Sequence, residues 1–216
     1  MTTFNDGAKN FAQSGIERQK AGELESSSGH GSSLKCTYET RQFIPHLIKE
    51  YSIESMIDLG CGDWNWMSKL REEIADVDYE GWDASEILIE ENTAKYQNDN
   101  TRFFCKDIIN NEIPKVDLAL CRDVMFHLKT EYTLQILENL KSSGVKYLLS
   151  TSYNEVTKNN DQHNVITKFG DWRFYYINLS IAPFNLEDAM LEYVYEESNH
   201  DKTHKRFLCF YDLSMV

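Results

Sequence analysis

The chain has 216 residues, of which 41% are hydrophobic, and this size and content predict one α/β domain with a sizeable core. Asp and Glu number 35 against 22 Lys and Arg, a formal net charge of -13, which disfavours nucleic acid as a partner because its phosphates would be repelled. The five cysteines are widely spaced with no C-x-x-C pair, which argues against a metal or disulfide scaffold. No stretch approaches the roughly 18 apolar residues of a membrane span, and residues 1–35 hold no signal-peptide core, so we expect a cytoplasmic protein without a membrane partner.

Residues 1–36 form a polar segment rich in Ser, Gly, Glu and Lys, with a Ser/Gly run over residues 26–33. Its composition favours a flexible tail, but its place directly before a helix also allows it to fold over a ligand. Thr37 is the predicted N-cap of that helix, and Pro45 inside the helical pattern predicts a kink or a restarted turn. The apolar stripe of the helix consists of Phe43, Ile44, Leu47, Ile48 and Tyr51.

From residue 55 onward, short apolar runs alternate with helical patterns, as in a parallel sheet with crossover helices. The expected strands are residues 56–59, 77–83, 101–105, 116–121 and 146–151. A helix is predicted over residues 130–141, capped by Thr130 and followed by Gly144 just beyond its end. Residues 190–195 and 206–213 are predicted to form an antiparallel hairpin.

The alternation of strands and helices stops at about residue 152. Residues 152–169 are polar without a clear period, and an aromatic, strand-like run follows over residues 172–179. Long segments of this kind often close over binding sites. We therefore expect residues 152–188 to act as a substrate lid within a domain of residues 37–216.

The first predicted strand leads into a tight turn that carries two glycines, Asp58-Leu59-Gly60-Cys61-Gly62-Asp63. Glycine permits the positive φ angles and the close backbone approach needed where a strand meets a ligand. The spacing is similar to the dinucleotide fingerprint, but Asn65 stands where the third glycine would be. A pyrophosphate site is therefore poorly supported.

Four predicted strands each end in or near an acidic residue. These acids are Asp58, Asp83, Asp107 and Asp123. In an open parallel sheet ligands bind outside the carboxyl ends of the strands, so four acids in register indicate a site. Simpler roles stay open for three of them: Asp83 as a helix N-cap, Asp107 as a turn residue, and Asp58 as an acceptor that only orients the glycine turn.

With these acids, the sequence resembles the class I S-adenosylmethionine-dependent methyltransferases over roughly residues 37–151 and the terminal hairpin. The motifs that carry the resemblance are Ile57-Asp58-Leu59-Gly60-Cys61-Gly62, Trp82-Asp83-Ala84, Lys106-Asp107-Ile108 and Cys121-Arg122-Asp123-Val124. The resemblance implies an α/β, three-layer, Rossmann-like, seven-stranded and mostly parallel sheet with a C-terminal antiparallel hairpin. It also implies S-adenosylmethionine as the cofactor, the ligand that residues 1–36 would cover if they fold over the site instead of forming a flexible tail.

In that family the glycines approach the methionine part of the cofactor, the acid after the second strand accepts both ribose hydroxyls, and the acid after the third strand holds the adenine amino group. By resemblance, the cofactor-binding residues are Asp58, Gly60, Cys61, Gly62, Asp83, Ala84, Asp107, Ile108 and Arg122. We add Arg41, which follows the Ser/Gly run, as a partner for the cofactor carboxylate. An ionised carboxylate is a pure acceptor, which suits a vicinal diol, and S-adenosylmethionine has no phosphate that would need a Walker motif.

Methyl transfer is an in-line displacement that mainly needs positioning and sometimes a base. Asp123 and His127 are expected one helical turn apart on a shared face, and we select them as catalytic candidates, with His127 as the base. The alternative for His127 is a packed or hydrogen-bonded histidine at a helix start. The substrate-binding candidates, all in the expected lid, are Trp172, Arg173, His163 and Tyr153.

The predicted function is S-adenosylmethionine-dependent methyl transfer to a small-molecule or sugar-type acceptor, without a metal. The chain has Cys121-Arg122-Asp123-Val124 where nucleic-acid amino-methylating enzymes carry [DN]-P-P-[YF]. Two alternatives stay open: an NAD(P)-dependent oxidoreductase on a similar fold, and a catalytically silent S-adenosylmethionine-binding module. The sequence carries no signal of the oligomeric state.

Overall fold

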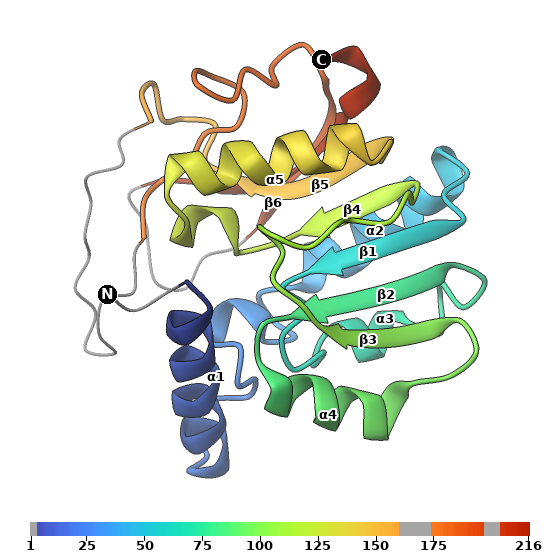
Figure 1. The fold of residues 1–216 in the computed structure, drawn as a ribbon, viewed down its shortest axis with the longest axis vertical. Coiled ribbons are helices and arrows are strands. Elements are labelled where there is room, and N and C mark those ends of the chain that lie inside the picture. The colour runs from blue at the N-terminus through green and yellow to red at the C-terminus, as the bar shows by residue number, and fades with distance from the viewer. Residues whose placement is uncertain (1–3, 160–173, 197–203) are drawn as a thin grey trace. The chain divides into compact units, whose positions relative to one another are not determined.

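The computed structural model describes residues 4–159, 174–196 and 204–216 (Figure 1). The chain divides into two compact units, residues 1–108 and 109–216, which we call unit 1 and unit 2. Seven strands make up the sheet, β3-β2-β1 from unit 1 and β4-β5-β7-β6 from unit 2. The expectation of a seven-stranded, mostly parallel α/β sheet that ends in an antiparallel hairpin is therefore confirmed.

In its described residues, unit 1 contains three parallel strands and four α-helices. Its elements are α1 (Phe4–Lys20), η1 (His30–Ser32), α2 (Tyr38–Glu50), β1 (Ser55–Leu59), α3 (Met67–Leu70), β2 (Asp78–Asp83), α4 (Glu86–Tyr96) and β3 (Thr101–Cys105). The register pairs Leu59 with Trp82 and Asp83 with Cys105, so the three strands end at one edge. The residues that follow these strand ends are thereby gathered at that edge.

The predicted helix after the Ser/Gly run is confirmed as α2, with Thr37 at its N-cap. The helix buries Ile44 and Leu47 from the predicted stripe, and it continues through Pro45 without restarting. A proline in a helix removes a single backbone donor, and burial of the apolar face compensates for that loss.

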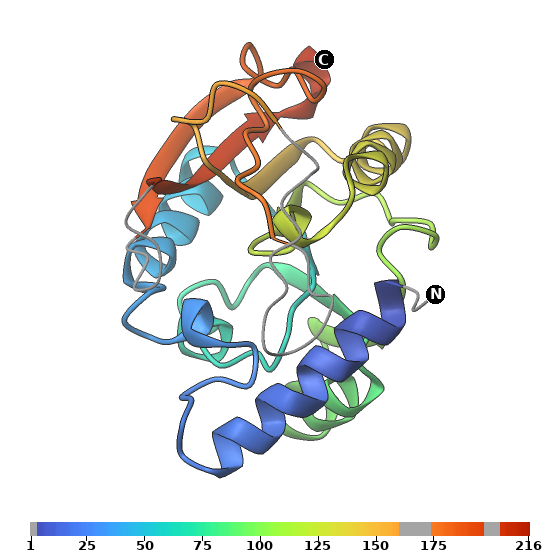
Figure 2. The same ribbon diagram turned by 90° about the vertical axis from the view of Figure 1, so that its left-hand side faces the viewer.

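Helix α1 is not foreseen by the polar composition of the first 36 residues. Its Ala12 and Ile16 form a buried cluster with Leu88 of α4, and the two helices lie against each other in Figure 2. A helix with so few apolar residues gains most of its stability from such tertiary packing, which local composition does not reveal.

Unit 2 contains four strands and one α-helix in its described residues. Its elements are β4 (Leu118–Cys121), η2 (Met125–His127), α5 (Thr130–Ser142), β5 (Tyr147–Ser152), β6 (Met190–Glu196), β7 (Arg206–Asp212) and η3 (Leu213–Met215). Strand β4 is parallel to β5, and β7 is antiparallel to both β5 and β6. The expected terminal hairpin is thus confirmed as β6 and β7.

Two local predictions in unit 2 differ from the structure. Thr130 is the first residue of α5 and Lys129 is the N-cap, whereas Gly144 has the expected left-handed conformation, with φ 74. Residues 174–179, the described part of the aromatic run, form no strand. Their backbone bonds go to single residues outside the sheet, such as the bond from Tyr175 N to Phe126 O, because the strand beside β5 is β7. None of the described helices is long and apolar enough to cross a membrane.

Candidate functional site

The turn after β1 depends on two left-handed glycines, Gly60 with φ 89 and Gly62 with φ 58. The amides of Gly60 and Cys61 both donate to Trp82 O, at 2.8 and 3.0 Å. Gly62 N donates to Asp83 Oδ2 at 3.1 Å, and Gly62 O accepts a bond from Asn92 Nδ2 at 2.8 Å. The turn is therefore fixed to β2 and α4, and non-glycine residues rarely adopt its backbone conformation.

Asp83, at the end of β2, holds this turn through its carboxylate. Besides Gly62 N on Oδ2, Oδ1 accepts a hydrogen bond from the amide of Ser85 at 2.8 Å, as in an Asx-turn. The N-cap of α4 is Ser85, so the simpler N-cap role predicted for Asp83 is wrong. Burial raises the pKa of Asp83, while the amides of Ser85, Gly62 and Ala84 oppose that rise. The two carboxylate oxygens together have four lone pairs, so the carboxylate can still accept a hydrogen bond in addition to those of the three amides.

Asp58 lies in β1 and is 4% exposed. Its Oδ2 accepts the hydroxyl of Tyr79 at 2.8 Å, and the Tyr79 oxygen accepts the indole N–H of Trp64 at 2.8 Å. Burial, together with the charge of Asp58, raises the pKa of Tyr79 and keeps the phenol protonated. The chain of bonds anchors Trp64, whose φ of 57 is left-handed. Asp58 thus supports the residues after the turn through Tyr79 and Trp64, and its predicted contact with the backbone amides of the turn stays a prediction.

Cys61, between the two glycines, is a buried thiol. Burial raises its pKa well above the ordinary value, and the charges of Asp83 and Asp58 add to the effect. The sulfur also lies 3.1 Å from where a Cβ on Gly81 would stand. Cys61 is therefore a protonated packing residue and not a nucleophile.

The structure also describes the remaining predicted cofactor residues of unit 1. Asp107 and Ile108 follow the end of β3; Asp107 is half-buried and Ile108 is buried. Ala84 follows Asp83 and is half-buried. Arg41, near the start of α2, donates from Nη2 to Leu34 O at 3.0 Å, and its buried Nε has no hydrogen-bond partner among the described residues.

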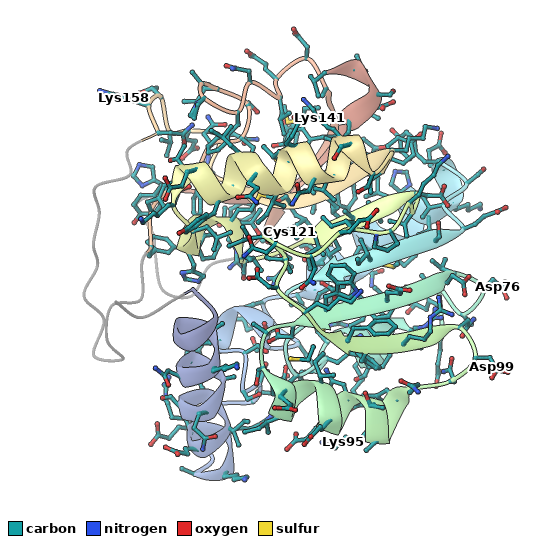
Figure 3. All side chains as sticks on the ribbon, viewed as in Figure 1. Asp76, Lys95, Asp99, Cys121, Lys141 and Lys158 are labelled. Carbon is teal, nitrogen blue, oxygen red and sulfur yellow. The ribbon has the colours of Figure 1, made fainter. Side chains whose placement is uncertain are left out.

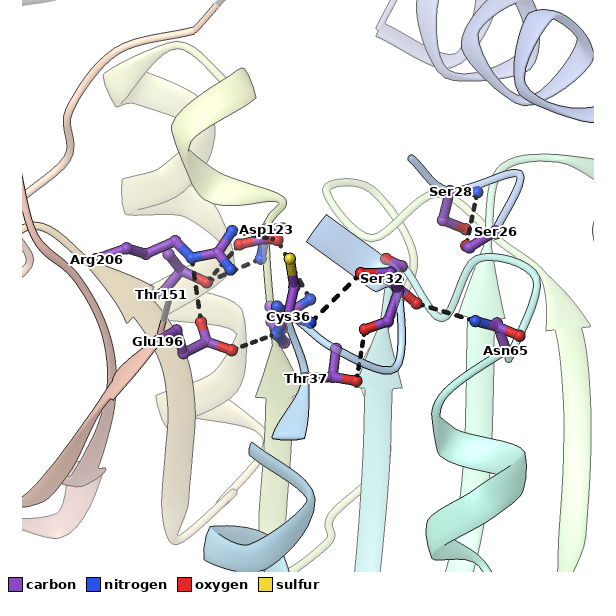
Figure 4. A network of polar contacts seen from close by, with 12 residues as sticks. Ser26, Ser28, Ser32, Cys36, Thr37, Asn65, Asp123, Thr151, Glu196 and Arg206 are labelled. Carbon is purple, nitrogen blue, oxygen red and sulfur yellow. Dashed lines mark hydrogen bonds and ion pairs between the residues drawn. The ribbon is translucent and has the colours of Figure 1, made fainter. Parts of the chain in front are cut away.

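In unit 2, a quartet of charged side chains, three of them buried and one half-buried, joins the ends of β4, β6 and β7 (Figure 4). Glu196 Oε1 accepts a hydrogen bond from Arg122 Nε at 2.8 Å, and Glu196 Oε2 lies 3.4 Å from Arg206 Nε. Asp123 Oδ2 lies 3.2 Å from Arg122 Nη1 and 3.0 Å from Arg206 Nη1. The two positive charges of the guanidiniums equal the two negative charges of the carboxylates. Charged side chains are tolerated in a protein interior when they are paired in this way.

Asp123 is held by more than these two ion pairs. Its Oδ1 accepts the hydroxyl of Thr151 at 3.0 Å, and its own amide donates to that hydroxyl at 2.9 Å. Burial alone would raise the pKa of Asp123, but Arg122, Arg206, Thr151 and the charge of His127 outweigh it and hold the pKa below 3.8. Such a carboxylate is a weak base, so the geometry favours a positioning role for Asp123 over proton abstraction.

The expected helical face shared by Asp123 and His127 is wrong. Asp123 has a left-handed φ of 57, and η2 covers only Met125–His127. His127 is half-buried, with its ring 4.4 Å from that of Phe126 and 6.2 Å from that of Phe174. The left-handed residue turns the chain after β4, so the imidazole enters an aromatic cluster instead of a helix surface.

We define the aromatic cluster as Phe126, His127, Tyr153, Phe174, Tyr176 and His204. Tyr153, a predicted substrate residue directly after β5, is buried, with its ring 5.1 Å from that of Tyr176. His127, Phe174, Tyr176 and His204 are half-buried, so the cluster has a partly accessible side. The other predicted substrate residues, His163, Trp172 and Arg173, lie outside the described residues.

Sequence reasoning missed several residues of these two regions. The quartet partners Glu196 and Arg206 sit at the ends of the hairpin strands, and Asp63 and Asn65, in the glycine turn, bind the N-terminal segment. The available signals were charged residues at strand ends and an acid directly after Gly62. Within the residues that the structure describes, no group of three or more His, Cys, Asp or Glu is arranged to hold a metal.

No protein-family profile matches the chain, and no curated protein sequence does. Solved structures do match. Magnesium protoporphyrin IX methyltransferase from Synechocystis PCC 6803, with S-adenosylhomocysteine bound, aligns with a TM-score of 0.66 at 17% identity, over 95% of this chain and 97% of that chain. The chain therefore has the fold of class I S-adenosylmethionine-dependent methyltransferases.

Two further methyltransferase structures agree. The N-methyltransferase NodS from Bradyrhizobium japonicum WM9, in complex with S-adenosylhomocysteine, is 12% identical, with a TM-score of 0.64 over 94% of this chain and 98% of that chain. The mitomycin 7-O-methyltransferase is 14% identical, with a TM-score of 0.62 over 94% of this chain and 60% of that chain. At these identities the likeness concerns the methyltransferase fold, and the chemistry has to be argued from the residues.

Proposed function

We propose that the protein is an S-adenosylmethionine-dependent methyltransferase that acts on a small-molecule or sugar-type acceptor. The observation that carries the proposal is Asp83. Its half-buried carboxylate fixes the glycine turn through Gly62 N and retains acceptor capacity for a hydroxyl donor of a ribose. The bound cofactors named for the matching structures support the same choice.

The residues of unit 1 fit this cofactor. Arg41 Nε and the Ser27 hydroxyl are buried donors without hydrogen-bond partners among the described residues, and a ligand carboxylate would satisfy them. The acids of unit 1 suit a cationic sulfonium, because opposite charge stabilises it. We assign Asp83 to the ribose, Asp107 to the adenine amino group and Arg41 to the cofactor carboxylate. S-adenosylmethionine, when bound, supplies an electrophilic methyl group.

The acceptor residues belong to unit 2. The aromatic cluster offers ring faces on which a planar ring or the C–H face of a sugar can pack, which favours acceptors that carry such a flat group. His127, half-buried in the cluster, accepts the proton of the attacking group at an imidazole nitrogen. Asp123 and the quartet fix the loop from which His127 projects. The basic side chains of the quartet are neutralised by Glu196 and Asp123, so they do not serve as an anion clamp.

The first experiment is calorimetric titration with S-adenosylmethionine, S-adenosylhomocysteine and NAD. We expect micromolar binding of the first two and none of NAD. Asp83→Ala should weaken S-adenosylmethionine binding at least ~100-fold, because the charge-assisted bonding to the ribose and the anchor of the glycine turn at Gly62 N are lost together. Asp99→Ala, before β3, should leave binding unchanged. Binding of NAD without S-adenosylmethionine would overturn the proposal in favour of an oxidoreductase.

The second experiment asks for turnover. The protein is incubated with methyl-labelled S-adenosylmethionine and fractionated cell extract, and label is followed by size class. We expect label in the small-molecule fraction. Tight cofactor binding with no label in any fraction would contradict the enzyme and favour a silent binding module, and label in the protein fraction would contradict the acceptor class.

A further inference from the structure

The N-terminal strap, which we define as residues 21–37, is held on the glycine turn by a set of bonds to Asp63. Its Oδ1 accepts the hydroxyls of Ser26 at 2.8 Å and Ser28 at 3.2 Å, and its Oδ2 accepts the amide of Ser27 at 2.8 Å. The amide of Asp63 donates back to Ser28 Oγ at 3.0 Å. One carboxylate thus binds three consecutive strap residues, and bonds to an ionised acceptor are stronger than neutral ones.

Asn65 holds a second part of the strap. Its Nδ2 donates to Glu25 Oε1 at 2.8 Å and to Ser32 O at 3.1 Å, a bond drawn in Figure 4. Glu25 Oε1 in turn accepts the amide of Leu34 at 2.9 Å. The residue that interrupts the dinucleotide spacing therefore has a positive role, because its amide closes the strap into a compact loop.

Gly62 is required by the strap as well as by its own backbone conformation. A Cβ at Gly62 would lie 2.1 Å from Ser28 Oγ, which is closer than two such atoms can approach. A Cβ at Gly15 of α1 would likewise lie 1.9 Å from Ser27 O. The strap is thus wedged between α1 and the glycine turn, and two glycines make room for it.

The strap also carries a sign of a ligand. Ser27 is 1% exposed, and its hydroxyl has no hydrogen-bond partner among the described residues, although its amide is bound to Asp63. A buried, unpaired hydroxyl has an energetic cost, and native proteins normally satisfy such groups. A polar ligand group at the glycine turn would satisfy it.

We propose that Asp63 and Asn65 are positioning residues that latch the N-terminal strap onto the glycine turn, so that the Ser27 hydroxyl contacts the cofactor and the strap slows its release. This inference rests on the proposed function, since the ligand at the turn is taken to be S-adenosylmethionine. The latch itself is a property of the cofactor-free protein. The two claims are therefore separately testable.

The test uses the full chain and two measurements. Hydrogen exchange of the peptide covering residues 21–37 reports the latch without cofactor, and chase of labelled S-adenosylmethionine reports its dissociation rate. Asp63→Asn and Asn65→Ala should both speed exchange in that peptide, and Asp63→Asn should raise the dissociation rate about tenfold, the equivalent of one charge-assisted bond. Two variants on different bonds guard against one that fails to fold.

Two further variants separate the effect of the Asp63 and Asn65 latch from the effect of the contact between Ser27 and the cofactor. Asp99→Asn removes an exposed acid from the turn before β3, at the opposite edge of unit 1, where Figure 3 shows Asp99 projecting, and it should change neither measurement. Ser27→Ala should weaken S-adenosylmethionine binding about fivefold without faster exchange, because it removes a single hydroxyl.

Three results are decisive. Unchanged exchange in both latch variants would refute the latch. Faster exchange with an unchanged dissociation rate would refute its role in retaining the cofactor. If the unaltered protein binds no S-adenosylmethionine while the exchange differences persist, the proposed function fails and the latch stands as a structural device for a different ligand.

Discussion

Glu196 is the residue of unit 2 whose substitution should change stability most. Its side chain is 0% exposed and it faces Arg122 and Arg206 at 2.8 and 3.4 Å. Glu196→Gln keeps the shape of the side chain but leaves two guanidiniums against the single carboxylate of Asp123. Removing one partner of a buried ion pair costs about 3–5 kcal/mol, so we expect the free energy of unfolding to fall by about that amount.

Urea titration measures this loss directly, and for a chain of this size it corresponds to a fall in Tm of about 6–20 °C. Glu187→Gln, an exposed carboxylate in the turn before β6, is the matched control and should cost less than about 0.5 kcal/mol. Glu196→Leu combined with Arg206→Met leaves the balanced Arg122–Asp123 pair and should be more stable than Glu196→Gln alone. A loss below about 1 kcal/mol for Glu196→Gln would refute the reasoning that the quartet is a charge-balanced unit.

Three further predictions concern other parts of the chain. In the folded protein the pKa of Asp123 lies below 3.8, the ordinary value of an aspartate, so the contribution of this carboxylate to stability is present above about pH 4 and is lost as the pH falls through the folded pKa. Asp123→Asn should therefore flatten the acid side of the profile of unfolding free energy against pH. An unchanged profile would contradict this. His127→Asn should lower methyl transfer at least ~10-fold while S-adenosylmethionine binding measured by calorimetry stays within ~2-fold, whereas equal loss of both would exclude the base role. Arg71→Met should lower the free energy of unfolding by about 3 kcal/mol in urea titration, because the buried guanidinium donates hydrogen bonds to Thr101 Oγ1, Val77 O and Asn100 O at 2.9, 2.7 and 3.0 Å. Arg102→Met is the control, since the Arg102 side chain is 42% exposed. Equal losses in the two variants would contradict a stabilising role for the buried guanidinium.

The elements that sequence predicts well are those whose own residues determine them. The run over residues 56–59 is fully buried in β1, and Gly60 and Gly62 have the positive φ angles expected of a strand-to-ligand turn. Asp83 ends β2, as its local pattern indicates, and it accepts the amide of Ser85 in an Asx-turn before α4. The spacing of apolar residues, the residue types at turns and the residues at helix ends are local signals, and they can be recognised in a single sequence.

The quartet could not be predicted, because its partners are far apart in the chain. Arg122 and Glu196 are separated by 74 residues, and Asp123 and Arg206 by 83. Their contact depends on the order β4-β5-β7-β6, in which β7 is inserted beside β5. The pairing of charges follows from strand order, which no local pattern encodes. The helical spacing of Asp123 and His127 failed for a related reason, since the left-handed backbone at Asp123 is held by Thr151 and the two arginines.

The strap shows a different limit of sequence reasoning. Ser/Gly-rich composition describes the unfolded preference of residues 26–33, but three of these serines are ordered by a single carboxylate at Asp63. A polar segment becomes ordered when hydrogen-bond acceptors elsewhere in the fold bind its donors. The free energy that orders it then comes from these tertiary hydrogen bonds. Composition alone therefore underestimates order in segments that have a specific partner.

Asn65→Gly discriminates between two explanations of the glycine turn, because it restores the complete G-x-G-x-x-G spacing. If the missing glycine excluded dinucleotides, the variant should gain NAD binding. The structure predicts otherwise. The third glycine of the fingerprint serves close packing of a long helix on the strand, whereas α3 has only 4 residues. Asn65 instead holds Glu25 and Ser32 of the strap.

We therefore expect Asn65→Gly to bind no NAD at about 1 mM in calorimetry, to exchange amide hydrogens faster in residues 21–37, and to release S-adenosylmethionine faster. Asn98→Gly, an exposed asparagine before β3, controls for the general effect of an added glycine and should leave the strap unchanged. Submillimolar NAD binding by Asn65→Gly would show that the glycine count selects the ligand. Without such binding, cofactor choice is assigned to Asp83 and the strap, since both act at Gly62.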